Sequence, residues 1–207
     1  MNFKLQFPIS EIDYWAARFR DDHGEMRREC AAFKAGQRLR RGEGTPMEIC
    51  NDLYTIGIWT APTALHLIRR NPASDILQAC RVASEASDEA SAIDVLEALK
   101  GVAVTMASAI LTTMDESRYT VIGWRAREAL GNPKVQQKEP AIEFYLCYLD
   151  GCRRLAEENG VTLRKLDQAL WAWSAIAGPN PSRTRKKSLR VYTDTKRANE
   201  PKQSDQE

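Results

Sequence analysis

Residues 94–130, DVLEALKGVAVTMASAILTTMDESRYTVIGWRAREAL, decide the fold of this 207-residue chain. They predict one helix that ends at Leu99 or at the next residue, and a second that runs through Met106 and Leu111. The turn between them, KGVA at 100–103, contains the single glycine of the hairpin that can take a positive φ. So short a turn leaves the first amides of the second helix facing outward, where they and the helix dipole attract a phosphate group.

This stretch resembles the hairpin of the helix-hairpin-helix DNA glycosylase superfamily. LKGVA at 99–103, followed by TMAS at 105–108, is similar to that family's LPGVG-x-x-x-A. DESRYTVI at 115–122 looks like the family's link into its next helix, and RAREAL at 125–130 like the start of that helix. The resemblance covers 94–130 alone, and hairpins of this kind also occur in polymerases, ligases and nuclease subunits.

The resemblance implies a monofunctional DNA glycosylase with double-stranded DNA as its partner. Such enzymes extrude one nucleotide from the duplex and hydrolyse its N-glycosidic bond. The residues implied to hold the DNA backbone are Lys100, Gly101, Val102, Ala103 and Thr105. These contacts position the protein without reading base sequence.

Two positions depart from the family pattern. The family's catalytic Asp, at the start of the helix after the link, aligns with Gly123. The lysine that bifunctional members use for a Schiff base aligns with Thr105, which cannot do that chemistry. We therefore expect no lyase activity, and if the protein is an enzyme its carboxylate comes from elsewhere in the cleft.

The candidates for that carboxylate are Asp115, Glu116 and Asp167. Asp167 is the preferred catalytic candidate, because it lies four residues before Trp171 and both then share one helix face. An acid for a base edge and a ring for stacking suit a flipped nucleotide. The alternative is that Asp167 pairs with Arg164 and that Trp171 is core.

Further aromatic residues are candidates for a base pocket. Trp59 ends one helix just before the next begins, which is where a ring facing an interlobe cleft would lie, although core packing is the alternative. Trp124 and Arg125 follow Gly123 directly and should face the same cleft. Arg125 could hold a phosphate there.

The rest of the chain reads as helical, with an all-α, two-lobed, glycosylase-like domain expected over 1–178 and the hairpin near 94–114. About nine or ten helices are expected, and Arg118–Ile122 is the only candidate strand. Segment 179–207 has no apolar periodicity and contains RTRKKSLR at 183–190. It is either a flexible tail or an arm that binds phosphates. Helix signals occur at Ser10–Asp13, Thr45–Glu48, Asn71-Pro72, 76–99, 139–159 and 162–177.

Composition excludes few functions. The net charge is +2, so a nucleic-acid surface must be a local patch. No apolar run is long enough to span a membrane, and acids at Glu11 and Asp13 argue against a secretory signal, which predicts a cytoplasmic protein. Five scattered cysteines lack the spacing for zinc or an iron–sulfur cluster, so neither metal nor cofactor is expected.

The sequence also allows two other functions. Without an acid at Gly123, the chain could be a catalytically silent DNA-binding protein of the same fold, in repair or phage defence. It could also be a helical interaction protein that binds no nucleic acid. A carboxylate that faces the cleft near Gly123 would favour the enzyme.

Overall fold

The computed structural model describes residues 3–132 and 140–179. Within those ranges the chain is all-helical and contains no strand, which confirms the expected all-α class. The candidate strand at 118–122 is wrong, because Arg118 lies in a turn and residues 119–122 have no regular secondary structure. The basic segment, apart from Pro179, lies outside the described residues.

The elements are η1 (Ile9–Glu11), α1 (Ile12–Arg20), α2 (His23–Arg41), α3 (Pro46–Thr60), η2 (Pro62–Ala64), α4 (Leu65–Ile68), α5 (Ala73–Glu85), α6 (Glu89–Glu97), α7 (Val104–Met114), α8 (Trp124–Ala129), α9 (Ile142–Glu158) and α10 (Leu163–Ile176).

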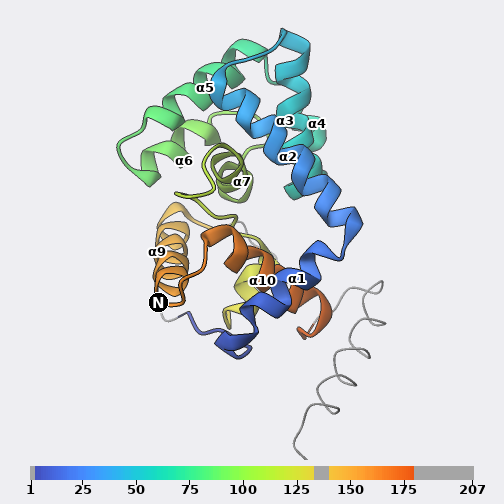
Figure 1. Cartoon of the computed structure of the whole chain (residues 1–207). Helices are drawn as coiled ribbons and strands as arrows, with labels where there is room; N and C mark the ends of the chain where they lie inside the picture. Colours follow the sequence, from blue (N-terminus) through green and yellow to red (C-terminus); the bar gives the residue numbers. More distant parts are fainter. Residues whose placement is uncertain (1–2, 133–139, 180–207) are drawn as a thin grey trace, which may run out of the picture.

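The helices form two groups (Figure 1). In one group α10 packs against α1, α8 and α9, and in the other α3, α5, α6 and α7 pack together. The long helix α2 begins beside α1 and runs into the second group, where it packs on α3 and α7. The N-terminal segment is tied to the first group, because the amides of Lys4 and Gln6 donate to carbonyls at the end of α8.

Helix α7 is the centre of the second group. Ten of its eleven residues are buried, all except Thr105. Helix α2 approaches it through Gly36, where an added Cβ would lie only 2.7 Å from the backbone carbon of Thr113. The side chain of Gln37 then donates to the carbonyls of Thr113 and Met114 at the end of α7. The hairpin therefore projects from the best-packed helix of this group.

Most helix boundaries follow their sequence signals. Thr45 and Glu48 form a capping box at the start of α3, and Gly160 takes a positive φ of 61° after α9. The prediction of one continuous helix over 76–99 is wrong, because α5 ends at Glu85 and α6 begins at Glu89. Asp88 accepts the amide of Ser91 and starts a new helix there. In the described ranges, none of the helices has the length and apolarity needed to cross a membrane.

Candidate functional site

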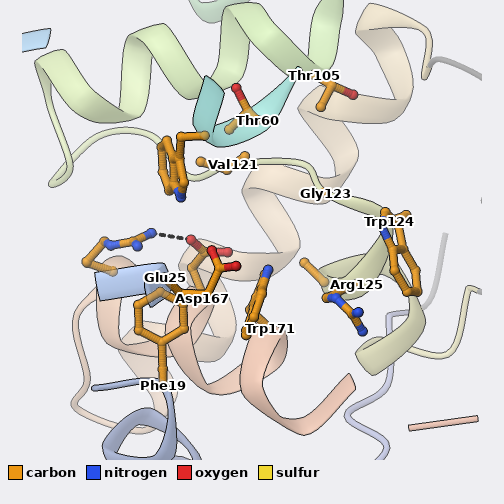
Figure 2. A pocket seen from close by; sticks show the side chains of 13 residues that line it. Phe19, Glu25, Thr60, Thr105, Val121, Gly123, Trp124, Arg125, Asp167 and Trp171 are labelled. Carbon is orange, nitrogen blue, oxygen red and sulfur yellow. Dashed lines mark hydrogen bonds and ion pairs between the residues drawn. The ribbon is translucent and has the colours of Figure 1, made fainter. Parts of the chain in front are cut away.

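A pocket of about 160 Å³ opens where the two helix groups meet (Figure 2). Its walls come from the end of α1, the start of α2, the end of α3, the start of α7, the link into α8, and α10. We call it the interlobe pocket. Its lining residues are Phe19, Glu25, Trp59, Thr60, Thr105, Val121, Gly123, Trp124, Arg125, Ala126, Arg164, Asp167 and Trp171.

Seven of the site residues expected from the sequence line this one pocket, although they come from four separate parts of the chain. Figure 2 shows Trp171 between Asp167 and Arg125, with Thr105 on the opposite wall. The structure thus brings the expected carboxylate and aromatic rings together. The seven are Trp59, Thr105, Gly123, Trp124, Arg125, Asp167 and Trp171.

Asp167 pairs with Arg164 and also lines the pocket. The ion pair and the place in the pocket, which were alternative predictions from the sequence, therefore occur together. Arg164 binds Asp167 and also Glu29 on α2, and Gln168 Nε2 donates to Glu29 at 3.0 Å. Burial raises the pKa of Asp167 to about 6; Arg164 lowers this pKa, and Glu29 raises it further. The Arg164 guanidinium therefore pairs with two buried carboxylates. Because of its burial, Asp167 binds its proton more tightly than an exposed aspartate does.

Aromatic rings surround these charges. Trp171 meets Phe19 edge to face, with ring centroids 5.3 Å apart, and it is half-buried rather than wholly in the core. Trp59 is also half-buried, and the Arg164 guanidinium lies 5.5 Å from its ring centroid. Flat apolar faces beside charged groups are what a planar heterocycle needs for stacking and edge recognition.

Arg125 lies between two of the rings. Its Cζ is 4.2 Å from the Trp124 centroid and 5.3 Å from the Trp171 centroid. Burial lowers the pKa of Arg125, while Glu128 and Glu25 raise it. A phosphate contact would require this guanidinium to turn outward from Trp171, so its expected role stays a prediction.

Gly123 is the N-cap of α8, with φ −88°. A Cβ built there meets no heavy atom within 4 Å, so the position can carry a side chain without strain. The link before it is held by buried groups, because Ser108 Oγ accepts the amide of Ile122 and Tyr148 Oη donates to the Val121 carbonyl. The backbone thus holds a side-chain position at the pocket wall, and glycine leaves that position empty.

The hairpin turn lies beside the pocket rather than in it. Asn71, which is buried, accepts the amide of Lys100 and donates to the Lys100 carbonyl, at 2.8 and 2.9 Å. The amide of Val102 donates to the Leu99 carbonyl. Within the described chain no hydrogen bond engages the amides of Gly101 and Ala103. Among the described residues, two amides of the expected phosphate site, four and two residues before Thr105, are thus available.

Gly101 takes the expected positive φ, 78°. A Cβ at this position would lie 2.9 Å from Leu67 Cβ and 3.1 Å from the Ala64 carbonyl, so it points at η2 and α4. The glycine is therefore needed for the turn and for its close packing on α4. Lys100 is exposed, whereas the Val102 side chain is buried and offers only its backbone.

Asp115 and Glu116 lie at the far end of α7 and do not line the interlobe pocket. Asp115 accepts the Ser117 hydroxyl at 2.6 Å, and Glu116 is exposed. Asp167 is thus the only one of the three sequence candidates in this pocket.

Sequence reasoning missed a second acid of the pocket, Glu25 on the first turn of α2. It also missed Phe19 and Thr60 as lining residues and Asn71 as the clamp on the hairpin turn. Glu25 follows a clear N-cap, Asp22, so the sequence is enough to place Glu25 on the first turn of a helix. The sequence does not indicate that this turn faces α8 and α10 across the pocket.

Scans of the chain against models of protein families, against curated proteins and against solved structures return no significant match. The functional interpretation therefore depends on the hairpin and the interlobe pocket.

Proposed function

We propose that this chain is a DNA glycosylase with a helix-hairpin-helix, glycosylase-like fold, which flips one base into the interlobe pocket and hydrolyses its N-glycosidic bond. One observation carries the proposal: Thr105 lies in the pocket wall two residues after Ala103, whose amide makes no hydrogen bond to any described residue. A phosphate held at the hairpin would therefore place its neighbouring nucleotide at the mouth of the pocket. Backbone contact beside an extrusion pocket is what base flipping requires.

The size and lining of the pocket support a single base as the occupant. A protein cavity of about 150 Å³ holds one benzene molecule. The interlobe pocket, at about 160 Å³, matches that scale, and its half-buried rings Trp59 and Trp171 offer faces for stacking. Drug-sized ligands occupy pockets of about 300–1,000 Å³.

The chemistry in this proposal is hydrolysis. Asp167, whose pKa is raised to about 6 by burial, donates a proton to the leaving base from its protonated form, which predominates below pH 6. Thr105 stands where a Schiff-base lysine would be needed, so water is the nucleophile.

A panel of duplexes tests the proposal. Each duplex carries one damaged, mismatched or hypermodified base, and alkali after a single-turnover incubation reveals abasic sites. We expect the unmodified chain to produce strand breaks in at least one duplex. Failure of every duplex to bind or break would contradict the proposal.

Gly123→Asp, run beside Gly123→Asn, separates the enzyme from its closest alternative. Both side chains fit the open position and favour an N-cap, so the fold should be retained. The alternative is a catalytically silent DNA-binding protein of this fold, which is favoured by the missing carboxylate at Gly123 and by the Arg164–Asp167 pair. Breaks with the Asp variant alone would support that alternative.

A further inference from the structure

The pocket contains a carboxylate that the family resemblance does not assign, on the first turn of α2. Glu25 lies on the first turn of α2, where Asp22 Oδ1 accepts the amides of Gly24 and Glu25 and fixes the turn. Only 19% of the Glu25 side chain is exposed, compared with 68% for Asp21 four residues earlier. Glu25 is also one of the residues that line the pocket (Figure 2).

The two acids of the pocket differ in how they are held. Asp167 is bound by Arg164, and both side chains are almost completely buried. Glu25 is bound through Oε1 by Arg28, whose side chain is 48% exposed and whose attraction is screened by water. Among the described residues, no hydrogen bond or ion pair engages Glu25 Oε2. Glu25 thus presents one oxygen to whatever enters the pocket.

The charge of Glu25 also reaches the region beside Gly123. The negative charge of Glu25 raises the pKa of Arg125, which lies two residues after Gly123. Removal of a base leaves a developing positive charge on the sugar, and a carboxylate in a pocket shielded from water stabilises such a charge. Gly123 lines the same pocket as Glu25, and a Cβ built at Gly123 meets no heavy atom within 4 Å.

We infer that Glu25 is the carboxylate that acts on the sugar, in place of the acid missing at Gly123. This inference rests on the proposed glycosylase function. The bond between the anomeric carbon and the base nitrogen breaks, and its electron pair stays with the base. The water oxygen bonds to the anomeric carbon and one water proton passes to Glu25 Oε2, while Asp167 supplies the proton that the base nitrogen takes up. Glu25 and Asp167 then re-equilibrate with solvent, so no other reactant is needed.

Binding to two abasic duplexes tests the inference without knowledge of the base. One duplex carries a cationic pyrrolidine in place of one deoxyribose, which resembles the charged sugar. The other carries a neutral tetrahydrofuran at the same position. Mimics of the charged transition state bind more tightly to a site built for that state. The ratio of the two dissociation constants cancels any general change in DNA affinity.

We expect the unmodified protein to prefer the cationic duplex and Glu25→Gln to reduce that preference about tenfold, which corresponds to about 1.4 kcal/mol. Asp21→Asn is the matched control, because it removes the same charge near the same helix start but outside the pocket lining. It should keep the preference.

The outcomes separate the inference from the function on which it rests. Two results would show that Glu25 does not act on the sugar while the glycosylase proposal stands. In the first, Glu25→Gln keeps the full preference for the cationic duplex. In the second, the unmodified protein binds both abasic duplexes more tightly than intact DNA but does not distinguish the cationic duplex from the neutral one. If the unmodified protein binds neither abasic duplex more tightly than intact DNA, both proposals are wrong.

Discussion

Replacing Gly36 with alanine should destabilise the protein by about 3 kcal/mol or more, because α2 and α7 cross there with no room for a Cβ. The added atom would lie 2.7 Å from the backbone carbon of Thr113 and closer still to the Thr113 side chain. A backbone atom cannot rotate away as a flexible side-chain end can, so the helices must separate. Urea unfolding measures the loss.

Gly123→Ala is the matched control for this substitution. The same methyl group meets no heavy atom within 4 Å at Gly123, and the backbone there is ordinary for any residue. We expect its free energy of unfolding to stay within about 0.5 kcal/mol of the original. Equal stability of the two alanine variants would show that the α2–α7 crossing is not as close as described.

Replacing Asp167 with asparagine should stabilise the protein at pH 7 by about 2–3 kcal/mol. The pKa of Asp167 rises from 3.8 in the unfolded chain to about 6 in the folded protein, chiefly through burial. A shift of about two units corresponds to this energy at about 1.36 kcal/mol per unit. The folded state binds the proton more tightly, so this stability is present below pH 4 and is lost as the pH rises to 6.

Asparagine resembles the protonated acid, so the variant should lack this loss. The difference in unfolding free energy between variant and original protein should be near zero at pH 4 and should grow to its full value by pH 7. An equal difference at both pH values would contradict the raised pKa. A stabilising change that abolishes base excision would fit a group retained for function at the expense of stability.

Local signals predicted the helices well, because caps and turns act within a few residues. The Thr45–Glu48 capping box and the positive φ of Gly101 are examples. The break at Asp88 was missed, since an alanine-rich stretch without glycine or proline reads as one helix. There the cap formed by Asp88 overrode the helix propensity of its neighbours.

The pocket could be predicted only in part. Trp124, Arg125 and Gly123 are neighbours in the sequence, so their common wall follows from the link. Asp167 and Trp171 follow from helical spacing. Glu25 and Asn71 could not be found in this way, because their roles depend on how α2 and α4 pack against segments many residues away.

The indole N–H signals of the five tryptophans test most directly whether the interlobe pocket receives a nucleotide. Trp59, Trp124 and Trp171 line the pocket, whereas Trp15 is fully buried and Trp173 packs on Phe7. Nitrogen-labelled protein is titrated with a duplex that holds one mismatched base pair, where flipping costs least. We expect the three pocket indoles to shift while Trp15 and Trp173 stay in place. Saturable DNA binding that leaves all three pocket indoles unshifted would contradict the account.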